Sequence, residues 1–249
     1  MDTAFFLELS RAARVAIAGA SRHPSNKASG SDFDPVTEAD KAAERALRAL
    51  IEERFPEHGI WGEEYGWSRE DADRHWSLDP IDGTRAFVCG LPSWAVLVGH
   101  LEGGSHVAGM IDLPALGETL VALDGETRRG DEPVRTSGRT LLSEARVATT
   151  DPGILSDSER ERFMRLYAAA PLTRYGLDAF AYARIATGDI DLVCETGLKK
   201  HDLDALVPVV RGAGGFVGNW QGGNDLSGGD LVAAATRDMY DAAIAELNR

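Results

Sequence analysis

The chain has 249 residues, and its 40 acidic against 26 basic side chains give a formal net charge of −14 at pH 7. The length predicts one large or two small domains, and the 43% hydrophobic content predicts a sizeable core rather than global disorder. The negative charge opposes generic nucleic-acid binding and favours metal cations. No run of 18 apolar residues predicts a membrane span, and the isolated Cys89 and Cys194 exclude a disulfide framework or a cysteine zinc site. We therefore expect a reduced, cytoplasmic protein without nucleic-acid or membrane partners.

The first half of the chain combines helical patterns with hairpin strands. Apolar residues at helical spacing predict helices over 3–20 and 37–55, joined by a polar loop over 21–35. Gly103-Gly104 predicts a hairpin turn. Short apolar runs predict strands over 59–62, 75–78, 94–101, 107–111 and 118–123.

The second half alternates helices and strands. Helices are predicted over 158–170, 175–186, 202–212 and 237–247, and strands over 190–195 and 231–235. Pro208 lies inside the third of these helices, so we expect a kink or a first-turn placement. The pattern favours an α/β layered sandwich, one compact unit whose two subdomains, 1–140 and 141–249, meet near residue 140.

One hexapeptide, Asp79-Pro80-Ile81-Asp82-Gly83-Thr84, carries the most chemical information. Its two carboxylates, three residues apart on a turn, repel each other unless a proton or a cation bridges them, and Mg²⁺ is the natural bridge. Gly83 allows close approach of a ligand, and Thr84 opens a short helix over 85–89 whose N-terminal amides suit phosphate. An ordinary Asx turn followed by a helix cap explains the same residues.

Three further acidic positions have both a structural and a chemical interpretation. Glu63 and Glu64 follow an apolar run, as a solvated pair or as carboxylates at a strand end. Asp40, three residues after Thr37, resembles a capping box. Asp202 has the position of a helix N-cap, which leaves its other oxygen able to face a metal.

Taken together, the motifs resemble the inositol monophosphatase family of metal-dependent, lithium-sensitive phosphatases. The resemblance covers nearly the whole chain in order. It rests on Pro35-Val36-Thr37-x-Ala39-Asp40, Gly62-Glu63-Glu64, the hexapeptide, and Asp202-x-x-Ala205 leading to Gly214-Gly215. It implies the αβαβα sandwich shared with fructose-1,6-bisphosphatase, and a homodimer.

The resemblance also implies roles for individual residues. Two or three Mg²⁺ ions per site would be held by Glu63, Asp79, the Ile81 carbonyl, Asp82 and Asp202. Asp40 and Thr84 correspond to the pair that activates the attacking water, and Glu63 joins them as a catalytic residue. The amides of Gly83 and Thr84 would hold the substrate phosphate, with Arg85 beside them.

Within the family the chain is most similar to the histidinol-phosphatases, on strings such as Gly90-Leu91-Pro92-Ser93-Trp94 and Gly197-Leu198-Lys199. Asp178 and Glu195 suit the ammonium and imidazole of histidinol phosphate through charge-assisted hydrogen bonds. The structural alternatives are that Asp178 caps a helix and Glu195 ends a strand. Departures from the group occur at Ala95, Leu177, Lys200 and His201.

Several alternatives stay open. A haloacid-dehalogenase phosphatase is one alternative, but its motif has one residue between the two aspartates. Here Pro80 and Ile81 separate Asp79 from Asp82, which argues against that class. Members of the same family that act on inositol phosphates, sugar bisphosphates or 3′-phosphoadenosine nucleotides share these motifs. The non-enzyme alternative is an acidic metal-binding or interaction protein that keeps the fold. The six histidines show no H-x-x-x-H pairing for zinc, so only His201, next to Asp202, attracts attention, and the tryptophans are expected in the core or at subunit contacts. The loop over 21–34, with Lys27, is expected to close over the site.

Overall fold

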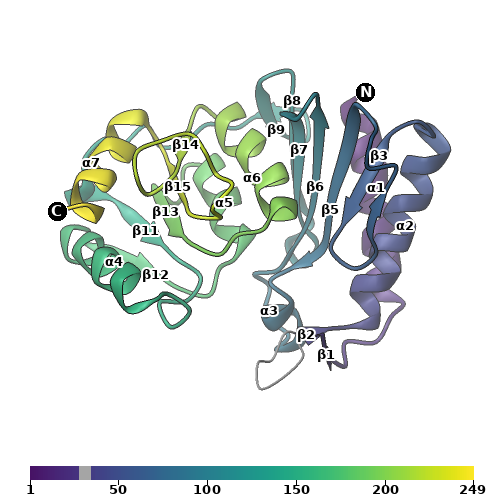
Figure 1. Cartoon of the computed structure of the whole chain (residues 1–249), viewed down its shortest axis with the longest axis horizontal. Helices are drawn as coiled ribbons and strands as arrows, with labels where there is room; N and C mark the ends of the chain where they lie inside the picture. The colour runs from purple at the N-terminus through teal and green to yellow at the C-terminus, as the bar shows by residue number, and fades with distance from the viewer. Residues whose placement is uncertain (28–34) are drawn as a thin grey trace.

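The computed structural model describes residues 1–27 and 35–249, and it shows the five layers of an αβαβα sandwich (Figure 1). The predicted architecture is therefore confirmed. Helices α1 (Thr3–Ala18) and α2 (Glu38–Arg54) cover the outer face of one sheet. Helices α5 (Ala179–Ala186) and α6 (Lys200–Gly212) lie between the two sheets, and α4 (Asp157–Ala169) and α7 (Arg237–Leu247) cover the outer face of the other.

The first large sheet has eight strands, antiparallel throughout except for the parallel pair β3–β5. The predicted hairpin at Gly103-Gly104 is confirmed, because Glu102 pairs with Ser105. In spatial order the strands are β10 (Glu132–Pro133), β9 (Glu126–Arg129), β8 (Glu118–Leu123), β7 (Ser105–Leu113), β6 (Ala95–Glu102), β5 (Arg74–Asp82), β3 (Gly59–Gly62) and β4 (Gly66–Ser68).

The second large sheet mixes parallel and antiparallel pairs. Its strands in spatial order are β12 (Leu172–Arg174), β11 (Arg146–Ala148), β13 (Leu192–Glu195), β15 (Leu231–Ala234) and β14 (Phe216–Gly218). A two-stranded sheet joins β1 (Ser25–Asn26) to β2 (Pro35–Val36), and α3 (Thr84–Val88) follows β5. The part of the predicted 21–34 loop between residues 28 and 34 lies outside the described residues. Among the described helices, none combines the length and apolarity needed to cross a bilayer.

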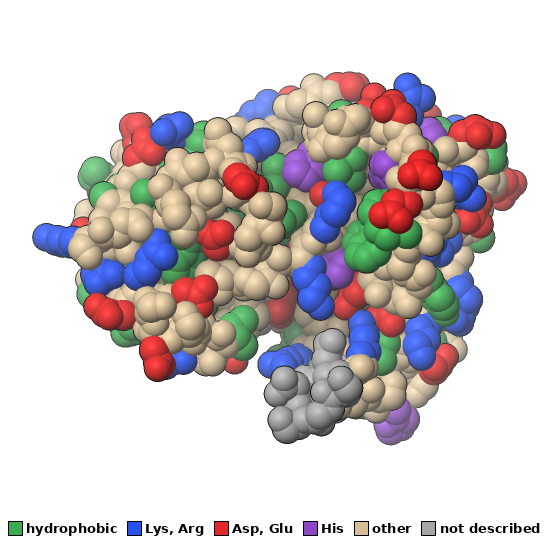
Figure 2. All heavy atoms as spheres, in the orientation of Figure 1, with side chains coloured by type: hydrophobic (Ala, Val, Ile, Leu, Met, Phe, Trp, Pro, Cys, Tyr) green, Lys and Arg blue, Asp and Glu red, His purple; other side chains and the backbone are tan. Residues whose placement is uncertain are grey.

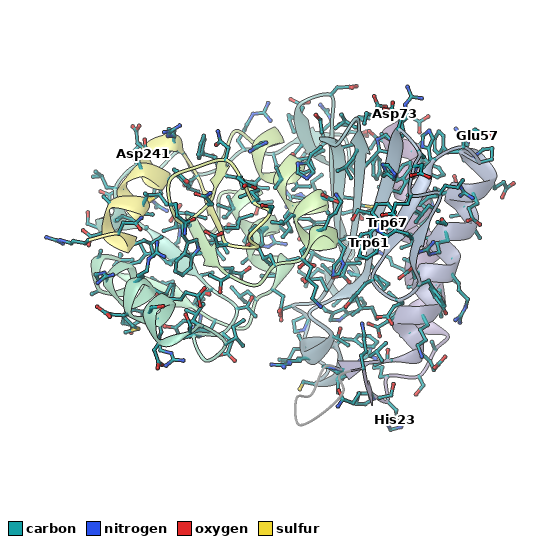
Figure 3. The ribbon with its side chains drawn as sticks, viewed as in Figure 1. His23, Glu57, Trp61, Trp67, Asp73 and Asp241 are labelled. Atoms are coloured by element: carbon teal, nitrogen blue, oxygen red, sulfur yellow. The ribbon has the colours of Figure 1, made fainter. Side chains whose placement is uncertain are left out.

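Aromatic side chains contribute to the core as expected for most tryptophans. Trp76, Trp94 and Trp220 are buried, and Trp76 packs against two phenylalanines of α1 with the ring planes steeply inclined. Trp61 and Trp67 are only half buried and pair across β3 and β4, with ring centroids 5.0 Å apart (Figure 3).

Two predicted helices begin at other residues in the structure. The helix predicted from residue 175 begins at Ala179, because Gly176 and Asp178 have φ of 73° and 46°, outside the helical region. The helix predicted from Asp202 begins at Lys200, so Asp202 occupies its third position instead of the N-cap. Pro208 lies inside this helix and not in its first turn.

Helix α6 approaches the first sheet to backbone contact. A Cβ on Gly99 of β6 would lie 2.6 Å from the carbonyl of Asp204, and one on Gly109 of β7 would lie 2.6 Å from the carbonyl of Ala205. Only glycine permits this approach, since a Cβ at either position would overlap the backbone of the helix. The two glycines therefore set how closely α6, and the acidic residue at its start, approach the sheet.

We predict that Gly99→Ala lowers the free energy of unfolding by about 2–3 kcal/mol, because the new methyl group must push α6 from the sheet. Urea denaturation followed by circular dichroism measures this loss. Gly19→Ala is the matched control, since the nearest atom to a Cβ there lies 3.6 Å away. Equal stabilities of the two variants would contradict the tight contact.

A buried aspartate ties the second sheet to the segment that enters it. The carboxylate of Asp191 accepts hydrogen bonds from Ser137 Oγ at 2.5 Å and from the backbone N–H of Arg146 at 2.8 Å. The Arg146 guanidinium donates two more, each 2.8 Å long. Burial alone would raise the pKa of Asp191, but the hydrogen bonds from Arg146 and Ser137 outweigh it and lower the pKa to about 2.

This depressed pKa predicts a pH-dependent contribution to stability. Because the folded value lies below that of the unfolded chain, the contribution is complete above about pH 4 and is lost as the pH falls toward 2. Asp191→Asn should therefore destabilise the protein by about 1–2 kcal/mol at pH 7, after allowance for solvent screening, and by less at pH 3. Urea midpoints at the two pH values check this, and a pH-independent difference would contradict it.

Candidate active site

The first four residues of the central hexapeptide form the irregular end of β5, where the sequence predicted a turn that follows the strand. Strand β5 continues through Asp79, pairs with β6 again at Asp82, and shifts register between these two residues. The intervening Pro80 has no N–H to donate, which suits such an irregularity. The Ile81 N–H donates to Asp79 Oδ1 at 3.0 Å, so the bulge is closed by one of the predicted carboxylates.

The four predicted metal-binding carboxylates converge at this bulge. One ligand atom each from Asp79, Asp82 and Asp202 lie within 4.8 Å of one another. A second group, with the same spacing, joins Asp79 to Glu63 and to His201. Strand β5 thus supplies the shared member, the turn after β3 supplies Glu63, and the first turn of α6 supplies the other two.

Burial and crowding disfavour negative charge in this cluster. Burial, followed by the charges of Glu63, Asp82 and Asp202, raises the pKa of Asp79 well above its ordinary value. Burial and the charges of Asp178 and Asp202 raise the pKa of Asp82 in the same way. The buried, mutually repelling oxygens fit a hard divalent cation, which neutralises several carboxylates at once. The Ile81 carbonyl oxygen, which accepts a hydrogen bond from Thr84 Oγ1 at 3.0 Å, is a further hard donor.

Glu63 is the exception, because basic side chains lie beside it. Lys27 Nζ lies 2.9 Å from Glu63 Oε1 and also contacts Glu64. Burial would raise the pKa of Glu63, but the charges of Lys27 and His201 lower it. Lys27, the last described residue before the gap, is therefore in contact with the acidic cluster.

A buried residue that the sequence analysis missed holds the turn carrying Glu63. Glu44 of α2 accepts hydrogen bonds from the backbone N–H groups of Glu64, at 2.7 Å, and Tyr65, at 3.2 Å. Its carboxylate also fills the space where Gly62 would carry a Cβ. The available signal was its position four residues after Asp40, which places two acids on one buried helix face.

Asp40 caps α2, as the pattern of residues 37–40 predicts. Its Oδ2 accepts from the Thr37 N–H at 2.8 Å and from Thr37 Oγ1 at 2.5 Å, whereas its Oδ1 is buried with no hydrogen-bond partner among residues 1–27 and 35–249. Within the described part of the chain no direct hydrogen bond joins Asp40 to Thr84. The free oxygen of Asp40 is therefore available to a water molecule.

The two acids predicted to contact substrate line a single cavity of about 170 Å³, together with Asp82. Burial raises the pKa of Glu195 to about 7 and that of Asp178 to about 6, although the charge of Arg85 acts in the opposite direction on Asp178. Asp178 occupies the N-cap position of α5 but makes no side-chain cap, and its carboxylate lies against Gly83.

Glu195 ends β13, as its structural alternative held, and its carboxylate is also fixed in place. Tyr182 Oη donates to Glu195 Oε2 at 2.7 Å, and Thr150 Oγ1 donates to Oε1. Figure 2 shows the surface hollowed at the junction of the two halves of the molecule, with acidic, basic and histidine side chains along its edges.

Comparisons with known proteins agree with this site. The sequence profile of the inositol monophosphatase family matches residues 2–249. The chain is 38% identical to the chloroplastic bifunctional phosphatase IMPL2 of Arabidopsis thaliana, over 87% of this chain and 66% of that protein, just under two thirds of its length. It is 35% identical to the histidinol-phosphatase of Mycobacterium tuberculosis, over 87% and 86%. A solved inositol monophosphatase from Zymomonas mobilis is 37% identical, with a TM-score of 0.87 over 98% and 96% of the two chains.

We predict opposite effects of Asp79→Asn on the metal-free and metal-loaded protein. Removing one of four crowded charges should raise the melting temperature without metal, since Asn can still accept from the Ile81 N–H. The same change should abolish most of the stabilisation that Mg²⁺ gives and reduce kcat by orders of magnitude. Thermal unfolding with and without Mg²⁺ measures the first two effects.

The exposed Asp73, the residue directly before β5, supplies the control Asp73→Asn. This variant should respond to Mg²⁺ as the unmodified protein does. Near-normal turnover by Asp79→Asn would contradict the assignment of the cluster.

Proposed function

The chain belongs to the inositol monophosphatase family, and from that premise we propose that it is a magnesium-dependent histidinol-phosphatase. The family places it among metal-dependent phosphatases. The observation that carries the finer proposal is the cavity that brings Asp82 of the acidic cluster together with two further buried acids, Asp178 and Glu195. A substrate that fills this cavity meets a metal-binding side at one end and carboxylates at the other.

Histidinol phosphate matches that division of charge. Its phosphate is anionic, whereas its other end carries an ammonium group and an imidazole. Charge-assisted hydrogen bonds from these groups to Asp178 and Glu195 are stronger than those between neutral partners. Tyr182 and Thr150 hold both oxygens of Glu195, so the carboxylate is oriented before the substrate arrives. Inositol phosphate, which has only hydroxyl groups beyond its phosphate, needs no such pair of acids.

The reaction is direct attack of water on phosphorus, without a phosphoenzyme. When bound to Glu63, Asp79, the Ile81 carbonyl, Asp82 and Asp202, two or three Mg²⁺ ions would neutralise phosphate charge and activate water. Asp40, through its unpartnered oxygen, and Thr84 orient that water and take its proton. The amides of Gly83 and Thr84, with Arg85, hold the phosphate in line for displacement.

A second candidate is an inositol-1-monophosphatase or a broader sugar or nucleotide phosphatase of the same family. The solved Zymomonas mobilis protein, named an inositol monophosphatase, is about as similar to the chain as the Mycobacterium tuberculosis histidinol-phosphatase is. A homodimer, lithium sensitivity and a cytoplasmic location stay predictions. The plant relative carries a chloroplastic name.

Phosphate release from L-histidinol phosphate and from myo-inositol 1-phosphate, each with and without Mg²⁺, tests the substrate. We expect a preference for histidinol phosphate of about a hundredfold in kcat/KM, equivalent to roughly 2.7 kcal/mol of transition-state discrimination. Equal rates, or a preference for the inositol ester, would overturn the substrate and keep the metal centre. No release from either would direct attention to nucleotide and sugar phosphates, and then to binding without turnover.

The variant Glu195→Gln sharpens the same experiment, because it removes the charge and keeps the size of the side chain. It should raise KM for histidinol phosphate and so lower the ratio of kcat/KM for histidinol phosphate to kcat/KM for inositol phosphate. The exposed Glu132→Gln serves as control and should leave both unchanged.

A further inference from the structure

We infer that His201 supplies an imidazole ligand to a divalent cation shared with Glu63 and Asp79, so that this position prefers a first-row transition ion such as Mn²⁺ to Mg²⁺. The inference rests on the proposed metal-dependent function and assigns one of its ions a nitrogen ligand. It concerns a position where the sequence departs from the histidinol-phosphatase pattern.

The location of the ring is the first observation. His201 lies in the first turn of α6 and is only 5% exposed. One of its ring nitrogens lies within 4.8 Å of a carboxylate oxygen of Glu63 and of one of Asp79. Its Nε2 is also 3.6 Å from Asp202 Oδ1. The imidazole therefore stands among three of the carboxylates that form the candidate metal centre.

The second observation is an unmet hydrogen-bonding requirement. His201 Nδ1 is buried, and no described residue is hydrogen-bonded to it. A buried polar atom left unpaired destabilises the folded chain, so such an atom calls for a function or for a partner from outside the protein. A cation bound through Nδ1 would supply that partner, whereas Nε2 lies 3.6 Å from Asp202 Oδ1.

Other histidines show what a purely structural role looks like in this fold. His106 Nε2 lies 2.9 Å from Asp204 Oδ1, and Asp204 belongs to α6, the helix that also carries His201. His58 Nδ1 accepts from Trp76 Nε1 at 3.1 Å. His100 is buried and unpaired as well, but its ring packs on Trp76 with centroids 4.6 Å apart, and no metal-binding group of the described residues includes it.

The donor set determines which ion is favoured. Mg²⁺ prefers oxygen ligands and retains water, whereas imidazole suits the later first-row ions, and Mn²⁺, although it also takes oxygen ligands, accepts a nitrogen ligand more readily than Mg²⁺ does. The neighbouring group of Asp79, Asp82 and Asp202 offers oxygen alone and should keep its preference for Mg²⁺. The two positions share Asp79, so the site is built to hold two different ions side by side. Lys27 contacts Glu63 Oε1, and the incoming ion shares that carboxylate with the ammonium group.

Calorimetric titration of the metal-free full-length chain with MnCl₂ and, separately, MgCl₂ tests the inference without relying on activity. We expect His201→Gln to weaken the tighter Mn²⁺ binding about tenfold or more and to change Mg²⁺ binding about threefold or less. His106→Gln is the matched control, since it removes a histidine that also contacts an aspartate, and it should alter neither affinity.

Pulsed electron paramagnetic resonance of Mn²⁺ bound to the unmodified chain, labelled with ¹⁵N-histidine, gives a readout that needs no variant to fold. Coupling of the ion to a ¹⁵N nucleus supports the inference, and its loss in His201→Gln assigns the nucleus. Absence of coupling, or equal weakening of both ions by His201→Gln, would overturn it and leave the proposed function standing. If the unmodified chain bound neither ion, the proposed metal-dependent function would fail together with the inference.

Discussion

Mutual repulsion among buried carboxylates is the constraint on which the rest of this structure depends. Asp79, Asp82 and Asp202 approach one another closely enough to share a cation, and burial removes the water that would otherwise screen them. Such an arrangement destabilises the chain on its own account. Two packed sheets and the helices between them hold the backbone in place against this repulsion. A cation that binds only the folded chain would offset the repulsion by stabilising the folded state.

The layers around α6 show how that backbone is held. Gly99 and Gly109 let the helix lie directly on the first sheet, while its other side faces the second sheet. Asp202 and His201 therefore reach the end of β5 from a rigid support. On the other side of the cluster, buried Glu44 fixes the turn that carries Glu63. Its carboxylate accepts hydrogen bonds from two backbone N–H groups of that turn. Neither support touches a reacting atom, yet each determines where a ligand atom lies.

Much of this architecture could be predicted from local patterns. The capping pair Thr37 and Asp40, the glycine hairpin and the apolar periodicity of the long helices each depend on neighbouring residues, and the structure confirms them. The bulge at Asp79 could not be predicted in this way, because it arises from pairing with β6. The start of α5 depends on unusual φ at Asp178, and the burial of Glu44 depends on a turn distant in sequence. Ordered motifs identified the acids, whereas the placement of His201 and the partners of Glu195 required tertiary structure.

The wide sequence separation of Glu63, Asp79 and Asp202 has a mechanical consequence. Cations bound at the two groups that share Asp79 would tie the turn after β3, the central strand and α6 together, as a covalent cross-link would. Any opening that lifts α6 from the first sheet must also release a bound ion. Metal binding therefore raises the free energy of local unfolding at this site. The supply of metal then affects the cooperativity of unfolding as well as turnover. Without bound cations the molecule can open locally, whereas the metal-loaded form must unfold as one unit.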